Sequence, residues 1–463
     1  MIPYSEILLL IRSTAKNVNI AYANALALAG EIKDSGVANE MKDCVELLDH
    51  TVDALAKSQS VIENQNGEYY GTGNRNADLK AWSGAAYVDL ETCIESFEGA
   101  KNLVKDNFII NLKQIKTQVS NLLGMVHDEN GHNTKFSYLQ QRYHKTPISA
   151  HVVVAKDGSG DFTSIKAAVL AAPDKSKQQY VIHIKKGLYK ENVEIKKNKR
   201  NLMLVGEGMD YTIISGRRNF VGGWRTYDSA TLIVGADRFI AQNLTIENTA
   251  GLNLAQAVAV RTDSDLTVFY KCRIKSYQDA LYVHTGRQFY RECQISGTTD
   301  FIFGEGPAVF QNCTILVRNG HPKPYNTITA HRCSNDNVTA AFSFQFCNIS
   351  ADTSLISSGL ESTYLGRPWR PTARTVFMQS YMSDIIRPEG WIRWDDSAPL
   401  DKLYYGEYMN SGLGAILGGR VKWPGYHVMD KHQAKQFTVA KLLDGKLWLP
   451  STGIDFTPGL EID

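Results

Sequence analysis

A repeat of 20 or 21 residues constrains the fold of this chain more than any other sequence feature. Each copy holds an aromatic residue, a cysteine and an isoleucine, and the copies are Phe269–Cys272–Ile274, Phe289–Cys293–Ile295 and Phe310–Cys313–Ile315. Short β-rich runs broken by Gly, Asp and Asn at this period are typical of a parallel β-solenoid. In such a coil, equivalent positions on successive turns stack at about 4.8 Å.

Two aspartates occupy equivalent positions in this repeat. Asp279 follows Ile274 by five residues, and Asp300 follows Ile295 by five residues. We therefore expect the two carboxylates to be neighbours on adjacent turns. A carboxylate pair of this kind suits acid/base or nucleophilic chemistry. A single aspartate in a solenoid turn is more often a turn former, so the pair needs further support.

The composition excludes several classes of protein. The 463 residues carry a formal net charge of +2, and no run of 18 apolar residues could span a membrane. No basic cluster interleaved with aromatic residues suggests nucleic-acid binding. The seven cysteines and eleven histidines include no CxxC pair and no metal-ligand spacing, so we expect no metal and no cofactor. The apolar run at residues 7–11 is too short for a signal peptide.

The chain changes character twice along its length. Residues 1–123 place apolar residues at a spacing of three or four, which predicts an all-α helical bundle. Residues 124–150 lack this periodicity and read as a linker. Residues 151–463 consist of short β-type runs separated by turn residues, and their tail, with Tyr404–Tyr408, Trp423 and Trp448, is expected to pack on the flank of the coil. Residues 1–124 hold 11 Lys or Arg and 16 Asp or Glu, so this part is acidic. The remainder holds 39 Lys or Arg and 32 Asp or Glu, and this mild basic excess favours an acidic polymer as its ligand.

Five motifs in the β-rich part occur in a recognisable order. They are Gly187–Glu191, Gln256–Arg261, Tyr277–Leu281, Asp300–Gly304 and Leu365–Trp369. Together they resemble the successive signatures of plant pectin methylesterases, and the resemblance covers essentially all of residues 150–463. Residues 36–99 resemble more loosely the pectin methylesterase-inhibitor domain that many plant members carry as an N-terminal pro-region.

The resemblance implies a right-handed parallel β-helix that hydrolyses methyl esters of homogalacturonan without a metal. It assigns five catalytic positions: Asp300 as nucleophile, Asp279 as general acid/base, Gln256 and Gln278 as oxyanion donors, and Arg367 as the residue that orients the nucleophile. It also implies that a sugar-binding groove is lined by Tyr282, Phe303, Trp369 and Trp391.

These residue types suit ester hydrolysis. An ester carbonyl needs an attacking oxygen, donors for the developing oxyanion and an acid for the leaving methoxide. Glutamine amides can donate to an oxyanion without a charge that would retain the anionic product. Arg367 can form charge-assisted hydrogen bonds to Asp300. An anion at that position favours the protonated form of Asp279, as a general acid requires.

Two positions depart from the family pattern. Ala280 stands where the family usually has Thr, and Glu305 stands where it usually has Asn. An extra carboxylate near the groove is expected to weaken binding of the de-esterified product. The inhibitor-like region also lacks the family's first cysteine pair, which leaves open whether this region inhibits.

The resemblance also suggests disulfides and modifications. Cys313 and Cys347 each precede an apolar strand residue by two positions, and the family supports a bridge between them. A similar bridge would join Cys44 and Cys93, while the partner position of Cys272 holds Thr245, so Cys272 is expected to be free. N-glycosylation sequons begin at Asn243, Asn312, Asn337 and Asn348.

The hypothesis drawn from these features is a secreted, monomeric pectin methylesterase of the plant cell wall with an inhibitor-like domain. Its expected partners are methyl-esterified homogalacturonan and inhibitor proteins of the pectin methylesterase-inhibitor family. A β-helical glycosidase remains an alternative, because paired carboxylates also cleave glycosides. A non-catalytic pectin-binding or inhibitory protein is another. The glutamine pair and Arg367 favour ester chemistry.

Overall fold

The structure is a computed structural model that describes residues 2–31, 35–64, 71–97, 103–126, 149–320, 324–358 and 362–460. Most of the predicted linker, residues 127–148, lies outside this range. The chain forms two compact units: residues 1–142 with 335–339, and residues 143–334 with 340–463. Within the described ranges, no helix is both long enough and apolar enough to cross a membrane.

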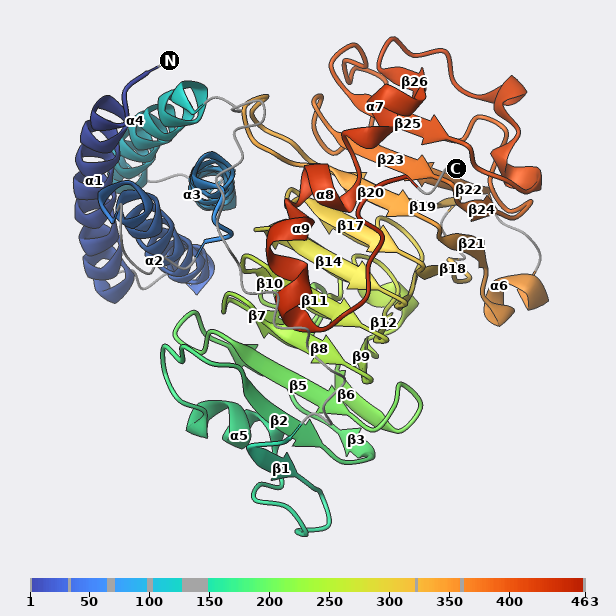
Figure 1. Ribbon diagram of the computed structural model, residues 1–463, viewed down its shortest axis with the longest axis horizontal. Coiled ribbons are helices and arrows are strands. Elements are labelled where there is room, and N and C mark those ends of the chain that lie inside the picture. The colour runs from blue at the N-terminus through green and yellow to red at the C-terminus, as the bar shows by residue number, and fades with distance from the viewer. Residues whose placement is uncertain are drawn as a thin grey trace. The chain divides into compact units, whose positions relative to one another are not determined.

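The N-terminal unit is helical, as its apolar periodicity predicts (Figure 1). Its helices are α1 (Tyr4–Glu31), α2 (Ser35–Glu63), α3 (Arg75–Ser96) and α4 (Leu103–Met125). Helices α1, α2 and α4 turn an apolar stripe inward, whereas α3 is buried on most of its surface; Ile11, Leu48, Leu90 and Leu112 are fully buried. Burial of these stripes against one another stabilises the unit through the hydrophobic effect.

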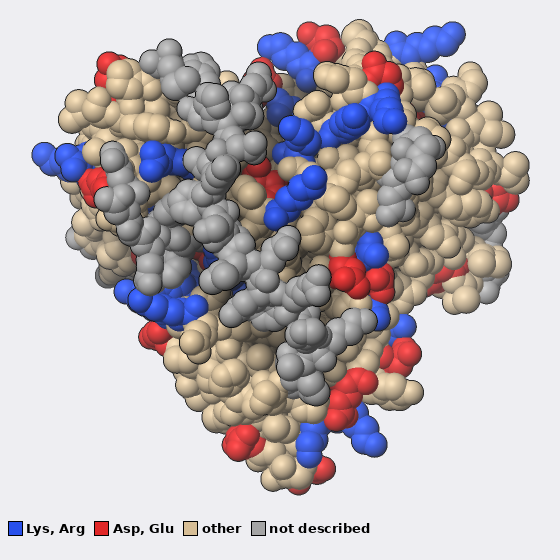
Figure 2. Space-filling model, in the orientation of Figure 1, with Lys and Arg blue, Asp and Glu red and all other residues tan. Residues whose placement is uncertain are grey.

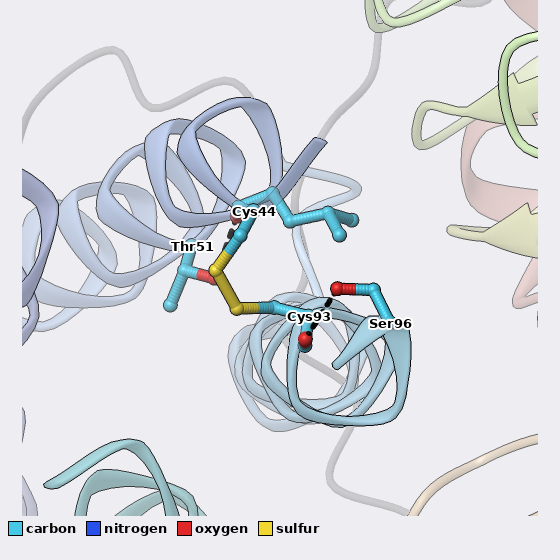
Figure 3. Close-up of a disulfide and its surroundings, with 5 residues drawn as sticks. Cys44, Thr51, Cys93 and Ser96 are labelled. Atoms are coloured by element: carbon cyan, nitrogen blue, oxygen red, sulfur yellow. Dashed lines mark hydrogen bonds between the residues drawn. A yellow bond between two sulfur atoms is a disulfide. The ribbon is translucent and has the colours of Figure 1, made fainter. Parts of the chain in front are cut away.

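A disulfide joins α2 to α3 (Figure 3). It links Cys44 to Cys93, whose Cα atoms are 4.7 Å apart, and confirms the predicted bridge. The bond closes a sequence separation of 49 residues. By restricting the unfolded chain, such a bridge typically contributes about 2–4 kcal/mol to stability.

The C-terminal unit is a parallel β-helix, and its described strands form three sheets (Figure 1). In spatial order, sheet A contains β1 (Val152–Val154), β2 (Tyr180–Ile184), β5 (Leu202–Gly206), β8 (Ile240–Gln242), β11 (Thr267–Tyr270), β14 (Gln288–Arg291), β17 (Ala308–Gln311), β20 (Phe342–Gln345), β23 (Arg374–Met378), β25 (Tyr404–Tyr408) and β26 (Tyr426–Val428). Sheet B contains β24 (Tyr381–Met382), β21 (Asn348–Ala351), β18 (Thr314–Val317), β15 (Gln294–Gly297), β12 (Arg273–Lys275), β9 (Thr245–Asn248), β6 (Thr212–Gly216) and β3 (Gly187–Tyr189). Sheet C contains β22 (Ser362–Gly366), β19 (Tyr325–His331), β16 (Ile302–Gly304), β13 (Leu281–Thr285), β10 (Val260–Asp263), β7 (Leu232–Val234) and β4 (Val193–Ile195).

Successive turns of the coil visit sheets A, B and C in that order, which is why the sequence repeats. The register confirms the repeat through the pairs Ile274↔Ile295 and Leu281↔Ile302, but it pairs Phe269 with Tyr290, one residue beyond the Phe289 that the sequence repeat aligned with it. The corner between sheets A and B recurs as one residue with positive φ, including Lys271, Glu292, Asn312 and Phe346. The strand pairing and these corners together set the turn length that the spacing predicted.

Like side chains stack inside the coil. An aromatic column beneath sheet A consists of Phe269, Tyr290, Phe310, Phe344 and Phe377, with successive ring centroids 5.2, 4.7, 4.5 and 4.5 Å apart. An isoleucine column beneath sheet B consists of Ile246, Ile274, Ile295, Ile315 and Ile349, all fully buried. Parallel stacking of this kind combines area burial with favourable ring geometry, so it ties the turns together.

The predicted Cys313–Cys347 disulfide is wrong. Both residues directly precede paired strands of sheet B, yet both are free, buried thiols. The Cys347 Sγ donates to the Phe310 carbonyl oxygen at 3.3 Å, and the Cys313 Sγ donates to the Tyr290 carbonyl oxygen at 3.4 Å. Each thiol is thus satisfied by the backbone of the preceding turn. Cys272 is free, as predicted, and burial raises the pKa of its thiol to about 12, which makes it a poor nucleophile.

Short helices and the tail complete the unit. They are α5 (Ile165–Ala171), η1 (Leu252–Leu254), α6 (Thr353–Ser358), η2 (Leu413–Ala415), η3 (Leu417–Gly419), α7 (Lys431–Lys435), α8 (Val439–Leu442), α9 (Gly445–Trp448) and η4 (Leu449–Thr452). Leu443 and Trp448, in the α8–α9 segment, belong to the same buried cluster as Val268 and Phe289 on the outer face of sheet A (Figure 1). This contact confirms the predicted packing on the flank for Trp448, whereas Tyr404–Tyr408 form strand β25 of the coil itself and Trp423 packs against its core.

Candidate active site

Asp279 and Asp300 lie at the same position on adjacent turns, just before strands β13 and β16. The register pairs Leu281 with Ile302, and the backbone N–H of Asp279 donates to the carbonyl oxygen of Thr299 at 3.2 Å. Both aspartates are largely buried, 7% and 5% exposed. The repeat in the sequence therefore corresponds to a real juxtaposition of these two positions.

Asp300 is held by a two-point ion pair. Arg367 donates from Nε to Oδ1 at 2.9 Å and from an Nη atom to Oδ2 at 2.5 Å. This forked geometry matches a carboxylate and is the strongest form of the charge-assisted hydrogen bond. Burial by itself would lower the pKa of Arg367, but the hydrogen bond and the charge of Asp300 raise it overall. Arg367 therefore keeps its positive charge in this pair.

Arg367 is placed by the Leu365–Trp369 motif at the end of β22. A Cβ atom at Gly366 would lie 2.0 Å from the Thr329 Oγ1, so only glycine lets the strand approach that closely. On its other side the guanidinium lies over the ring of Trp394, 4.2 Å from its centroid. Trp394 is half-buried. Sequence reasoning missed this contact, although Trp394 follows Trp391 by only three positions.

The assignment of Trp391 to the sugar-binding wall is wrong. Its side chain is 1% exposed and belongs to the core of the β-helix. The ring stacks on Tyr405 with centroids 4.0 Å apart, and its Nε1 donates to Glu407 at 3.4 Å. Burial of the large apolar ring of Trp391 inside the coil is more favourable than its exposure at the surface. Of the two tryptophans, Trp394 is the more exposed.

Aromatic side chains form a row beside the aspartates, which we call the aromatic row: Tyr227, Tyr282, Phe303 and Trp369. Because Leu281 lies in the core, its strand neighbour Tyr282 points out of the coil. The Tyr282 and Phe303 rings stack at 4.3 Å, Phe303 lies 6.1 Å from Trp369, and Tyr227 meets Tyr282 edge-on at 6.5 Å. The predicted residues Tyr282, Phe303 and Trp369 are therefore brought together, and Tyr227 is an addition.

A buried ionic cluster supports one end of the aromatic row. Arg261, in register with Tyr282, forms an ion pair with Asp263 at 2.7 Å and lies 3.3 Å over the Tyr227 ring. Asp263 also contacts the Nδ1 of His284 at 2.7 Å. Burial lowers the pKa of His284, although Asp263 opposes that shift. Sequence reasoning gave these charged residues no role, because their sequence spacing has no distinctive pattern.

The two glutamines lie at the turns that lead into strands of sheet C. The backbone carbonyl oxygen of Gln278 accepts a hydrogen bond from the backbone N–H of Ala257. The backbone carbonyl oxygen of Gln256 accepts one from the backbone N–H of Phe220 at 2.9 Å. Both glutamines are partly exposed, in contrast to the buried aspartates. The backbone thus places both glutamines at the edge of sheet C that also carries Asp279 and Asp300.

Glu305 does not present a free carboxylate beside the site. It is 2% exposed and forms an ion pair with Arg332 at 2.8 Å. The backbone N–H of Ser334 also donates to it at 2.6 Å. The expectation of a repulsive charge at position 305 is therefore not supported by its surroundings. Ala280 is fully buried in the core, so it offers no group to the site.

The structure is a parallel β-helix in which two aspartates lie at equivalent positions on adjacent turns, and comparisons with known proteins narrow the class of protein further. A sequence model described as pectinesterase matches residues 151–446, and one described as plant invertase/pectin methylesterase inhibitor matches residues 5–125. The chain therefore belongs to the pectinesterase family. It is a pectinesterase, a carboxylic ester hydrolase, with an inhibitor-type domain before the catalytic one.

Individual relatives agree with this membership. The chain is 50% identical over 440 residues to the pectinesterase/pectinesterase inhibitor PPE8B of Prunus persica, covering 93% of this chain and 84% of that protein. Among solved structures, a pectin methylesterase from carrot superposes with a TM-score of 0.67 at 43% identity, over 68% of this chain and all of that one. A pectin methylesterase from Aspergillus niger superposes with a TM-score of 0.57 at 30% identity, over 67% and 97%.

Proposed function

We propose that this protein hydrolyses the methyl esters of homogalacturonan, giving pectate and methanol, with Asp300 as the nucleophile and Asp279 as the general acid/base. The observation that carries the proposal is the forked Arg367–Asp300 ion pair, one turn away from Asp279. The forked pair from Arg367 gives Asp300 an environment of its own, and different environments for the two aspartates are what acid and nucleophile roles require.

The first step forms a bond between an Asp300 carboxylate oxygen and the ester carbonyl carbon. The tetrahedral oxyanion accepts hydrogen bonds from the amides of Gln256 and Gln278. As the intermediate collapses, the bond from carbon to the methoxy oxygen breaks, and protonated Asp279 transfers its proton to that oxygen. Methanol leaves, and the galacturonyl group remains joined to Asp300 as an acyl-enzyme.

The second step returns the enzyme to its starting state. Asp279, now ionised, takes a proton from water as the water oxygen attacks the acyl carbon. The same two amides, of Gln256 and Gln278, hold the second oxyanion, and the bond to Asp300 breaks. Net consumption is one ester and one water, and the products are one carboxylic acid and one methanol.

The aromatic row is proposed to contact the faces of the sugar rings, because aromatic rings combine a large apolar area with an edge that accepts polar neighbours. On the face of the molecule drawn in Figure 2, a row of Lys and Arg side chains crosses the upper part of the view, whereas Asp and Glu are more scattered. Basic side chains favour a polyanion such as partly de-esterified pectin.

We further propose the division into an inhibitor-type domain at residues 1–123, a linker at 124–150 and a catalytic domain at 151–463. Secretion to the plant cell wall is proposed with it, and inhibitor proteins of the family are the proposed protein partners. The sequon residues Asn312, Asn337 and Asn348 are exposed and Asn243 is partly exposed, so all four could carry glycans. A monomer remains our expectation.

The test of the reaction class is to measure methanol and new reducing ends together when purified protein acts on highly methyl-esterified pectin. We expect methanol to accumulate while reducing ends stay at the level of the blank. New reducing ends without methanol would favour a glycosidase, and neither product would favour a binding protein. The same assay on pectin stripped of its methyl esters is the control and should give no methanol.

A further inference from the structure

Thr327 lies one turn beyond Asp300, at the equivalent position of the next coil. The register of β16 with β19 pairs Ile302 with Thr329, which sets Thr327 opposite Asp300. The side chain of Thr327 is fully buried. Asp279, Asp300 and Thr327 therefore form one column across three successive turns.

The hydroxyl of Thr327 makes two hydrogen bonds to the same residue. It accepts from the backbone N–H of Asp300 at 2.9 Å and donates to the Asp300 Oδ1 at 2.6 Å. A hydroxyl has a single proton, so accepting one bond while donating the other leaves it no freedom to turn away. Thr327 thus binds both the backbone and the carboxylate of Asp300. The φ angle of Asp300, 52°, is unusual for a residue other than glycine.

The two oxygens of Asp300 are left in different states. Oδ1 accepts from Thr327 and from the Arg367 Nε, while Oδ2 accepts only from an Arg367 Nη atom. An ionised carboxylate offers about four acceptor sites, two on each oxygen. Among the residues that the structure describes, both sites of Oδ1 are therefore used, and one site of Oδ2 remains open.

We propose that Thr327 is a positioning residue that fixes Oδ1 of Asp300 and so makes Oδ2 the attacking oxygen. This inference rests on the proposed role of Asp300 as nucleophile. In the first step the new bond joins Oδ2 to the ester carbon, and the methoxide leaves with the proton of Asp279. Arg367 contacts both oxygens of the Asp300 carboxylate from one side. Thr327 adds a hydrogen bond from the next turn, which opposes rotation of the carboxylate about its Cβ–Cγ bond.

Removing the hydroxyl tests the proposal. In Thr327→Val we expect kcat to fall by about 10- to 100-fold, the loss expected for a hydrogen bond to a charged group at the reacting centre. KM should stay within about twofold, since Thr327 is buried and binds no sugar. Thr327→Ser keeps the hydroxyl and should recover most of kcat.

A matched control comes from Thr212, whose buried hydroxyl also accepts a backbone N–H, from Glu207, and donates to the Ile184 carbonyl oxygen. Thr212→Val should lower the melting temperature by an amount similar to that in Thr327→Val, with kcat unchanged. If Thr327→Val fails to fold, Thr327→Ala is measured in its place and read in the same way.

The outcomes separate this inference from the proposed function. Wild-type kcat in Thr327→Val, together with an inactive Asp300→Ala, overturns the role of Thr327 and leaves the nucleophile in place. A Ser variant as slow as the Val variant, or a loss that appears only in KM, also overturns it. An active Asp300→Ala overturns the proposed nucleophile itself.

Discussion

Asp279 and Asp300 share an unusual backbone as well as equivalent places on adjacent turns: their φ angles are 61° and 52°. Residues other than glycine seldom adopt this conformation, and Asp and Asn are among the few that tolerate it. Such a conformation persists where the surrounding structure holds it, as the strand pairing does here. The two carboxylates therefore leave the coil from matching backbone geometry and differ mainly in their partners.

Asp279→Asn should stop catalysis without disturbing the fold. Asparagine tolerates the same positive φ, but its amide cannot supply a proton to methoxide. We expect kcat for methanol release to fall by at least about 10²-fold, which is a typical contribution of general acid–base catalysis. A variant that keeps kcat within threefold of wild type would remove Asp279 from the mechanism.

Arg367→Lys should be far from conservative. Lysine keeps the charge but loses the fork that contacts both oxygens of Asp300 and the flat surface that stacks on Trp394. We expect kcat to fall by roughly 10- to 100-fold, as for loss of one or two hydrogen bonds to a charged group. The measurement is initial rates of methanol release at saturating pectin.

The control for this variant is Arg420→Lys, since Arg420 makes a forked ion pair with Glu407 that is more buried than the Arg367–Asp300 pair and involves neither aspartate of the candidate site. That change should reduce stability and leave kcat intact. Similar losses of kcat in both lysine variants would mean that the effect of Arg367 is structural.

His331 should make stability fall in mild acid. Burial lowers the pKa of His331 well below its ordinary value, and the charge of Arg374 lowers it further. Its Nδ1 accepts the backbone N–H of Arg374 at 3.0 Å, which requires the neutral ring. Because the folded pKa is below the unfolded value near 6.5, the contribution is present above pH 6.5 and is lost as pH falls.

The test compares unfolding free energies between pH 7 and pH 5. Each pH unit below the unfolded pKa costs about 1.4 kcal/mol through this one residue. His331→Gln, which can still accept the same N–H, should flatten the pH dependence, while His432→Gln at an exposed position should not. Parallel curves for wild type and His331→Gln would refute the prediction.

Removal of the N-terminal domain should raise activity if that domain inhibits. We compare methanol release by the full chain and by residues 150–463, and then add back separately produced residues 1–126. Inhibition predicts a faster truncated enzyme that slows again on addition. Equal rates in all three samples would assign residues 1–123 to folding or secretion instead.

The sequence was sufficient to predict the column of Asp279 and Asp300, because two consecutive turns keep the same length. It was not sufficient for Thr327, which follows Asp300 by 27 residues where Asp300 follows Asp279 by 21. The longer connection before β19 breaks the period, so a search by spacing passes over Thr327. Only strand register shows that it stands on the same column.

The errors have a common origin. Trp391 and Trp394 are alike in sequence, and only their packing decides that one stacks on Tyr405 inside the coil while the other meets Arg367 outside. Cys313 and Cys347 are correctly placed on neighbouring turns, but adjacency does not decide whether two thiols join. In each case the sequence pattern predicted the position in the coil, and local contacts decided whether a side chain is buried or exposed and whether two thiols form a disulfide.

The most direct measurement of the central claim is methanol release from esterified pectin by Asp300→Ala. Asp265→Ala serves as the matched control, because Asp265 is as buried as Asp300 and accepts a forked pair from Arg287 elsewhere in the coil. With both variants folded, as judged by circular dichroism, the account predicts no methanol above the blank from Asp300→Ala and wild-type turnover per folded molecule from Asp265→Ala. Substantial methanol release by Asp300→Ala would contradict the assignment of Asp300 as the nucleophile.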